Sequence, residues 1–404
     1  MTRLLFLQNL DRVSSLLLRL EKQIKFFLFY FLIDMEEDYI ALGSDENDKS
    51  GQLDEDERPY HYPWWEQTTD NTMASFQAEI EDFVNFLQPT QEEINIRHYL
   101  IHKIRYHIRQ RWSDAKVHVF GSFKTNTFLP DSDMDLMVEL PGYPTSSDLY
   151  TVASVLYQAK VSKRYPTVIG KATVPVVKFE ERLTGLKVDI ILNSFGGVDC
   201  ATYVSRKLSE YPGARQLTLI IKHIVALREV NEVYTGGIGG FGVVCMVISF
   251  LQMHPMVASG TIDPQKNLGT LLLDFLQLYG IHFAVGKVAI SVSHKGKYYP
   301  KMTNCLRQGK PVFSIEDPLD AKNDIGVKSF NALTVVKVFR RAYVDMTNRA
   351  YAMLRSTQPK KECLLTYIGY IPESMIQQRN IIAQAYDEQL WQDDPAADSF
   401  VWPT

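Results

Sequence analysis

Residues 117–138 read VHVFGSFKTNTFLPDSDMDLMV, and this stretch decides the fold. The apolar run 117–120 predicts a strand that ends in a turn at Gly121 and Ser122, where a helix begins. The first backbone N–H groups of a helix have no partner within it, and they suit a phosphate group. With the Ser122 hydroxyl, this turn therefore predicts a polyphosphate site.

Two aspartates follow this turn at the start of a second predicted strand, Met134–Val138. Side chains alternate along a strand, so Asp133 and Asp135 face one side while Met134 and Leu136 face the core. Two carboxylates on one face repel each other unless a divalent cation lies between them. Mg²⁺ prefers such oxygen ligands together with substrate phosphates.

A third carboxylate, Asp189, interrupts the apolar strand predicted over residues 186–192. An isolated buried carboxylate is costly, and joining the same metal cluster would remove that cost. Two-metal nucleotidyl transfer needs shared carboxylates of this kind. The alternative is an ordinary Asp-rich turn over 130–133, with Asp189 at a strand edge.

Other motifs follow in a specific order. They are Leu129-Pro130, Val188-Asp189-Ile190, Asn231–Ile238 (NEVYTGGI), Ser249–Pro255 (SFLQMHP), Asn267–Gly269 (NLG), Ile315–Leu319 (IEDPL) and Asn323–Gly326 (NDIG). From about Tyr62 to Tyr351 the chain resembles the DNA polymerase β-type nucleotidyltransferase superfamily. More closely, it resembles the noncanonical nuclear poly(A) polymerases of the Trf type, which work in TRAMP-like complexes.

The resemblance implies an α+β fold with a cleft between two domains. One is a polymerase β-like nucleotidyltransferase domain, a small mixed sheet with helices; the other is a mainly helical central, or PAP-associated, domain. The expected divisions are an acidic, disordered extension (1–58), a strap and helix packing on the helical domain (59–89), the catalytic domain (90–208), the helical domain (209–356) and a C-terminal tail (357–404).

The resemblance also implies the site residues. Asp133, Asp135 and Asp189 are the expected catalytic and metal-binding residues, with Mg²⁺ as cofactor and Mn²⁺ as a substitute. Asp189 would also take the proton of the attacking hydroxyl. The expected nucleotide-binding residues are Gly121, Ser122, Asn193, Gly197, Lys222, Phe241, Asn323 and Asp324.

Several of these nucleotide contacts have a structural alternative. Lys222 would hold the triphosphate, although a helix lysine is commonly only solvated. Phe241 would stack on the base, or else pack in the core. Asn323 offers the donor and acceptor that suit an adenine edge. Uridine-adding relatives usually place a histidine here, and none occurs between Ser314 and Phe330, which favours ATP.

Three positions depart from the family pattern. Asn126 stands where a glycine is usual, and asparagine tolerates a left-handed backbone. Gly240 replaces a serine that donates to phosphate in relatives, and Val327 replaces an arginine expected near the nucleotide. Each lost contact would weaken nucleotide binding by roughly 1–3 kcal/mol if a charge stayed unpaired.

Gly237–Gly242 also fits the G-x-G-x-x-G pattern of dinucleotide sites. Such a fingerprint must leave a strand and open a helix. The segment before it is predicted to be helical, so we discount a dinucleotide site. The glycines would instead let the chain approach a nucleotide closely.

The rest of the sequence predicts a part with both helices and strands, followed by a mainly helical part. Expected helices span 73–87, 90–112 (capped by Thr90 and Glu93), 147–159, 216–228, 241–253, 268–278 and 330–354; strands are expected at 173–179 and 188–192 and a hairpin at 288–299. The basic residues of helix 90–112, Arg97 among them, form either a solvated face or a strip near the RNA path.

Composition bounds these interpretations. The 404 residues allow two or three domains, and the net charge of −4 argues against a globally basic nucleic-acid binder. The four scattered cysteines have no metal or disulfide spacing and are expected to be reduced. The apolar run 24–33 is too short to span a bilayer. We expect residues 1–34 to be an amphipathic extension or an upstream start-codon artefact.

The expected protein is therefore a template-independent RNA 3′-terminal adenylyltransferase that uses ATP and two Mg²⁺ ions in nuclear RNA surveillance and decay. Alternatives are a terminal uridylyl- or mixed-nucleotide transferase, and a catalytically weak scaffold of an RNA complex. Expected partners are ATP, RNA 3′ ends, a zinc-knuckle RNA-binding protein and an RNA helicase, with no membrane. The expected location is the nucleus, with the nucleolus as one candidate compartment.

Overall fold

The computed structural model describes residues 62–65, 73–301, 306–307, 309–355 and 363–402, all within one compact unit, His61–Thr404. The expectations for residues 1–58 lie outside these described residues. None of the described helices combines the length and apolar character that crossing a bilayer requires.

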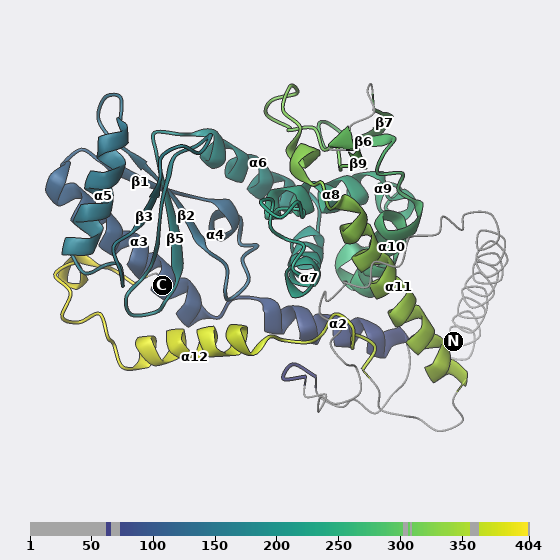
Figure 1. Ribbon diagram of the computed structural model, residues 1–404. Helices are drawn as coiled ribbons and strands as arrows, with labels where there is room; N and C mark the ends of the chain where they lie inside the picture. The colour runs from purple at the N-terminus through teal and green to yellow at the C-terminus, as the bar shows by residue number, and fades with distance from the viewer. Residues whose placement is uncertain (1–61, 66–72, 302–305, 308, 356–362, 403–404) are drawn as a thin grey trace, which may run out of the picture. The chain divides into compact units, whose positions relative to one another are not determined.

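A five-stranded mixed sheet forms the catalytic half of the described chain, in the order β1-β2-β5-β4-β3 (Figure 1). Only β2 and β5 run parallel; the other neighbours are antiparallel. The strands are β1 (Lys116–Phe120), β2 (Met134–Glu139), β3 (Thr167–Ile169), β4 (Val176–Glu180) and β5 (Lys187–Leu192). All but β3 were expected from the sequence.

The register aligns one residue from every strand in a single row. Phe120, Asp135, Asp189, Lys178 and Thr167 are successive cross-strand partners from β1 to β3. Cross-strand partners project from the same face of a sheet. Both strand aspartates therefore lie side by side on one face, with a lysine next in the row.

The opposite face of the sheet is apolar and covered by two helices, α3 (Gln91–Arg111) and α5 (Ser146–Gln158). Met134, Leu136 and Ile190 are completely buried there. Helix α3 begins with the predicted capping box: the Glu93 N–H donates to the Thr90 hydroxyl at 3.3 Å, and the Thr90 N–H donates to Glu93 Oε2 at 2.8 Å. This core fixes which strand residues remain on the aspartate face.

A second core lies in the mainly helical half, where the hairpin of β6 and β7 also packs. Its elements, together with shorter ones nearby, are α2 (Met73–Leu87), α6 (Gly196–Glu210), α7 (Ala214–Leu227), α8 (Gly240–Met253), α9 (Pro255–Ala258), α10 (Leu268–Gln277), a π-helical turn (Leu278–His282), β6 (Val288–Ser291), β7 (Lys297–Pro300), β8 (Leu306–Arg307), β9 (Lys310–Pro311) and α11 (Ala332–Arg355). Between the sheet and α6 to α8, the short helix α4 (Gly121–Thr125) follows β1.

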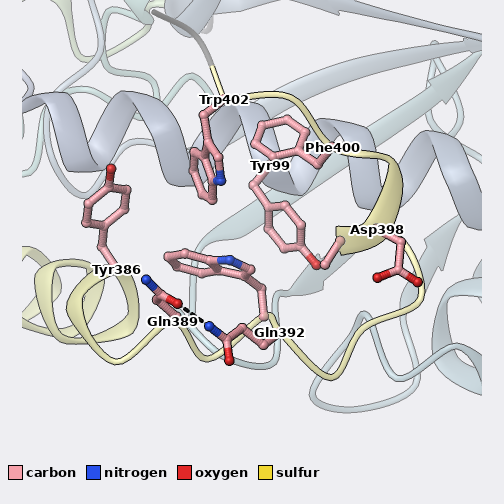
Figure 2. A pocket seen from close by; sticks show the side chains of 9 residues that line it. Tyr99, Tyr386, Gln389, Gln392, Asp398, Phe400 and Trp402 are labelled. Atoms are coloured by element: carbon pink, nitrogen blue, oxygen red, sulfur yellow. Dashed lines mark hydrogen bonds between the residues drawn. The ribbon is translucent and has the colours of Figure 1, made fainter.

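The segment expected only as a C-terminal tail contains helix α12 (Glu373–Asp387). Met375 of α12 packs in the helical core, whereas Ile382 packs in the catalytic core, so one helix bridges both. Beyond α12, Phe400 and Trp402 gather against Tyr99 of α3 (Figure 2); the Phe400 and Trp402 rings lie 4.8 Å apart.

Candidate functional site

A cavity of about 690 Å³ opens beside the aspartate face of the sheet, among α4, α6, α7 and α8. Seven of the residues expected from the sequence line it. They are Gly121, Ser122, Asp133, Asp135, Gly197, Lys222 and Phe241. A cavity of this size suits a small-molecule ligand the size of a nucleotide.

The turn from β1 into α4 requires glycine at position 121. Gly121 has φ +62°, and a Cβ built there would lie 2.0 Å from Oδ2 of Asp135. Any side chain would therefore strain the backbone and displace the carboxylate. Asn126, where α4 ends, has φ 53°, which confirms that asparagine accepts the left-handed conformation there.

Asp133 stands directly before β2, at the end of a loop held by a buried guanidinium. Arg97 of α3 is fully buried. Its Nη1 donates to the Ser132 carbonyl at 3.0 Å, and its Nη2 donates to the Pro130 carbonyl at 3.1 Å. The Arg97 guanidinium also lies 4.6 Å from the ring centroid of Phe128. The loop that presents Asp133 is thus fixed from behind by α3.

Burial and neighbouring negative charge raise the pKa of Asp135 and Asp189. Burial raises the pKa of Asp135 to about 7, with further increases from the charges of Asp189 and Asp133; Lys222 and Lys178 oppose them. Burial also raises the pKa of Asp189, although its bond with Lys178 lowers it. Uncompensated negative charge concentrated in this way favours a bound cation.

Asp189 is engaged by Lys178 of β4, whose ammonium donates to Asp189 Oδ2. As the side chains stand, no group of three His, Cys, Asp or Glu residues in the described part of the chain is arranged to hold a metal ion. Asp189 is the next residue to Asp135 in the cross-strand row, but it is not among the residues that line the cavity.

Lys222 of α7 reaches the cavity from the helical half. Its ammonium donates to the Thr127 carbonyl at 2.8 Å. Burial lowers the pKa of Lys222 to about 8, while the charges of Asp135 and Asp131 act in the opposite direction. A cation held in an enclosed site opposite carboxylates suits a ligand that brings additional negative charge.

Two glycines and one aromatic ring shape the far wall of the cavity. A Cβ at Gly197, in the first turn of α6, would lie 2.7 Å from the Phe120 ring, so glycine permits this close approach. A Cβ at Gly240, by contrast, would lie 3.5 Å from Lys222 Cε, an ordinary contact. Phe241 lines the cavity and is also partly buried against the helical core.

Three expected nucleotide contacts do not line this cavity. Asn193 joins the ends of β2 and β5: its amide donates to the Leu140 carbonyl at 2.9 Å, and its Oδ1 accepts from the Leu140 N–H at 2.7 Å. Asn323 donates to Asp317 at 2.9 Å. Asp324 accepts from the Ser314 hydroxyl at 2.7 Å and from two backbone N–H groups.

The G-x-G-x-x-G segment lies in a turn after helix α7 and opens α8, with no strand before it. The structure therefore confirms that this pattern is not a dinucleotide fingerprint. Val327, at the position where the resemblance leads us to expect an arginine, is 43% exposed.

Sequence reasoning missed two charged residues of the site, Arg97 and Lys178. Alternation within β4 (Val177 and Phe179 buried, Lys178 exposed) was a usable signal for the face of Lys178. No local signal pairs β4 with β5, because strand pairing depends on the whole sheet. Arg97 lay within a run of basic residues, and its burial depends on the loop 130–132 folding back onto α3.

Two family models match the chain. One describes the central palm domain of mitochondrial-like poly(A) RNA polymerases and covers residues 76–204. The other describes the Cid1 family of poly(A) polymerases and covers residues 267–323. The matches fall on the catalytic half and on part of the helical half.

Individual relatives give longer matches. The poly(A) RNA polymerase protein 2 of Saccharomyces cerevisiae is 40% identical over 69% of this chain, but the chain spans only 49% of that protein. An inactive noncanonical poly(A) RNA polymerase of Drosophila melanogaster, Trf4-2, is 32% identical over 81% of each chain. A solved polymerase core of TRAMP, an RNA surveillance complex, matches 80% of this chain and 99% of its own, with 35% identity and a TM-score of 0.67.

Proposed function

This chain belongs to the Trf-type noncanonical poly(A) polymerases of the nucleotidyltransferase superfamily, and we propose that it adds adenylate from ATP to RNA 3′ ends. The observation that carries the proposal is the one cavity that is lined by the Gly121-Ser122 turn, Asp133, Asp135 and Lys222. Carboxylates face an ammonium there across a space of nucleotide size, as a triphosphate site requires.

In the proposed reaction, the RNA 3′ oxygen attacks the α-phosphorus of ATP. The bond from that phosphorus to the bridging oxygen breaks, and pyrophosphate leaves. Ser122 and Lys222 hold the triphosphate, and Phe241 stacks on the base. A carboxylate oxygen of Asp189 accepts the proton of the 3′ hydroxyl. Gly197, Asn193, Asn323 and Asp324 complete the assigned nucleotide site, the last three by fixing the surrounding backbone.

We assign Mg²⁺ to Asp133, Asp135 and Asp189, with Mn²⁺ as a substitute. The donor set fits, because three oxygen ligands with raised negative charge density suit a hard divalent cation. When bound, the metal would supply charge neutralisation for the triphosphate and for the attacking oxygen. Lys178 would then have to release the Asp189 oxygen that it now holds.

We also propose the division into a strap and helix (59–89), a catalytic domain (90–208) and a helical domain (209–356). The existence of two hydrophobic cores supports it. We propose that its partners are a zinc-knuckle RNA-binding protein and an RNA helicase, and that it is located in the nucleus, the nucleolus included; the match to the polymerase core of TRAMP, an RNA surveillance complex, supports an assembly of this kind. We expect weak RNA affinity for the chain alone.

A second candidate is a catalytically inactive scaffold. One observation favours this candidate: Trf4-2, which matches across 81% of its length, is described as inactive. The family resemblance adds that a phosphate-binding serine is expected where this chain has Gly240. The cavity has room for a side chain at position 240, since a Cβ there meets only Lys222 at ordinary contact distance.

One assay separates the candidates. The purified chain, with and without a zinc-knuckle partner, is incubated with labelled RNA and each nucleotide separately, beside Asp135→Asn. We expect incorporation of ATP above UTP, GTP and CTP, and at least a 100-fold loss in Asp135→Asn. Preference for UTP, or no preference, would support the uridylyl or mixed-nucleotide alternative; incorporation retained by Asp135→Asn would refute the site.

Gly240→Ser and Gly240→Ala extend the same assay. Both variants add the same Cβ, but only serine adds a hydroxyl beside Lys222. We expect Gly240→Ser to lower the KM for ATP by roughly threefold to tenfold relative to Gly240→Ala. If neither the wild type nor Gly240→Ser incorporates any nucleotide with the partner present, the scaffold is the correct interpretation.

A further inference from the structure

A long stretch of the catalytic half carries only positive charge. Between Asp148 and Glu180 the sequence contains no aspartate or glutamate, although the whole chain has a net charge of −4. The charged residues of this stretch are Lys160, Lys163, Arg164, Lys171 and Lys178, and all five are exposed. A local surface of one charge sign attracts polyanions even when the protein as a whole is acidic.

Exposed tyrosines lie within the same stretch. Tyr150, Tyr157 and Tyr165 are 54%, 49% and 52% exposed. Tyr150 and Tyr157 are seven residues apart on α5, so they share one face of that helix. The rings of Tyr157 and Tyr165 lie 5.5 Å apart in an edge-to-face arrangement. Large aromatic side chains are costly to leave in water unless they serve contact with a partner.

We call these three tyrosines with Lys160, Lys163 and Arg164 the basic–aromatic surface. The three basic residues follow the end of α5 and lie between Tyr157 and Tyr165 in the chain. The closest acidic partner of the three is Glu180, 3.9 Å from Lys163 and itself exposed. Exposed pairs of that kind are weak, so the positive charges remain available to phosphates.

The basic–aromatic surface lies beside the β3 edge of the sheet: Tyr165 shortly precedes β3, and α5 packs on the apolar face opposite the aspartates. Tyr165 lies two residues before Thr167, which occupies the end of the cross-strand row. Lys178 and then Asp189 follow Thr167 in that row. Adjacent strands lie about 5 Å apart, so Thr167 is roughly 10 Å from Asp189. Tyr157 and Tyr150 both lie on α5, about 10 Å apart along the helix axis.

We propose that the basic–aromatic surface binds single-stranded RNA immediately upstream of the 3′ end, with Thr167 and Lys178 leading to the catalytic carboxylates. The proposal rests on the proposed function for the position of the 3′ end. Exposed π faces together with positive charges are the two requirements for sequence-independent binding of a single strand: bases stack on the rings, and phosphates contact the cations.

The first experiment measures binding of the full chain to fluorescent oligo(A) of about 15 and about 4 nucleotides, by anisotropy. Tyr157→Leu/Tyr165→Leu removes both π faces, and Tyr157→Phe/Tyr165→Phe keeps them. We expect the leucine variant to bind the longer RNA at least tenfold more weakly, since each lost stack costs roughly that factor. The phenylalanine variant should bind within about twofold of wild type, and binding of the shorter RNA should change little in either.

The second experiment tests the charges. Replacing Lys160, Lys163 and Arg164 by glutamine should reduce the salt dependence of RNA affinity by about two units of slope, because each single-strand phosphate contact contributes about 0.7. The matched control replaces three exposed lysines of the helical half by glutamine: Lys266, Lys295 and Lys337. That control should leave the slope unchanged, and an equal loss in both triple variants would overturn the proposal.

Extension assays separate this proposal from the proposed function. If the wild type extends RNA, the leucine variant should raise the KM for the longer RNA at least tenfold while the KM for ATP stays the same. If no nucleotide is incorporated but the leucine variant still loses RNA affinity, the result would support RNA binding by the basic–aromatic surface. The same result would contradict the proposed adenylate addition. Unchanged RNA affinity in the leucine variant overturns the surface as an RNA site, and a protein partner lost by the same variant would then be its occupant.

Discussion

Position 121 shows how closely the backbone of the site approaches a carboxylate. We predict that Gly121→Ala lowers nucleotide incorporation about 100-fold, because a displacement of about 1 Å at a reacting group has an effect of that order. The displaced group is Asp135, whose Oδ2 would lie 2.0 Å from the new Cβ. Steady-state incorporation with saturating RNA would measure the change.

Gly196→Ala is the matched control for this prediction. Gly196 also lines the cavity, but a Cβ there meets no atom within 4 Å. The control should keep activity within about twofold of wild type, because exposed substitutions rarely change stability by more than about 0.5 kcal/mol. Equal activity of the two alanine variants would show that the Gly121–Asp135 contact does not matter for the reaction.

The role of Arg97 could not be predicted from the sequence alone. The many basic residues of α3 predict a solvated face or a strip near the RNA path. The structure shows that Arg97 does neither: it is fully buried and fixes the 130–132 loop. No spacing rule distinguishes it from exposed Arg111, because the acceptors are carbonyl groups more than 30 residues away.

At the scale of elements, α3 and the C-terminal segment are joined by a charge network. Asp394 lies 3.0 Å from the Lys103 ammonium and 3.6 Å from His107, both on α3. Lys103 also lies 3.5 Å from Glu181. Burial opposes the negative charge of Asp394, but the nearby His107 ring, the hydrogen bond from the Ala396 N–H and the Lys103 ammonium hold the Asp394 pKa well below its usual range.

A lowered pKa in the folded state determines in which direction the stability changes with pH. The Asp394 carboxylate stabilises the fold above its unfolded pKa of about 4, and this contribution is lost as pH falls toward the folded value. We predict that Asp394→Asn lowers the free energy of unfolding by about 3 kcal/mol at pH 7. The difference from wild type should narrow steadily below about pH 4 in urea unfolding.

The neighbouring exposed residue provides the control. Asp393→Asn should shift the free energy of unfolding by no more than about 0.5 kcal/mol at any pH. A difference between Asp394→Asn and wild type that grows toward acid pH would contradict the assigned network.

Individual helices and strands were easier to predict from the sequence than the way they pair and pack with one another. Helix 73–87 and the capped helix from Thr90 were expected almost to the residue, because apolar periodicity and capping are local signals. Helix α6 was missed, and the segment of α12 was expected only as a tail. Strand β3 has three residues, too few for a periodic signal. That Asp135 and Asp189 lie close together was inferred from their chemistry, because no local sequence pattern specifies that β2 and β5 pair as parallel strands.

At the scale of the whole molecule, α12 ties the two cores together. Met375 and Ile382 lie on one helix but in different cores. We predict that the described unit unfolds in one cooperative transition, and that a chain ending at Pro372 unfolds in two, because it loses this continuous connection. Urea unfolding followed by far-UV circular dichroism and by tryptophan fluorescence would measure the number of transitions.

Trp391→Ala offers a milder control for the truncation. It removes a buried ring from the catalytic core, which typically costs about 3–5 kcal/mol, but it leaves α12 intact. This variant should unfold at lower urea and still show one transition. Coincident transitions in the truncated chain would mean that contacts other than α12 couple the cores.

The five-strand row has a consequence for how this chain can vary in evolution. A shift of one residue in β5 would turn Asp189 into the apolar core and bring Ile190 beside Asp135. Insertions and deletions within the central strands are therefore excluded in any functional descendant. Changes in length should instead accumulate where the chain is free of that constraint, such as the exposed loop 170–174 between β3 and β4.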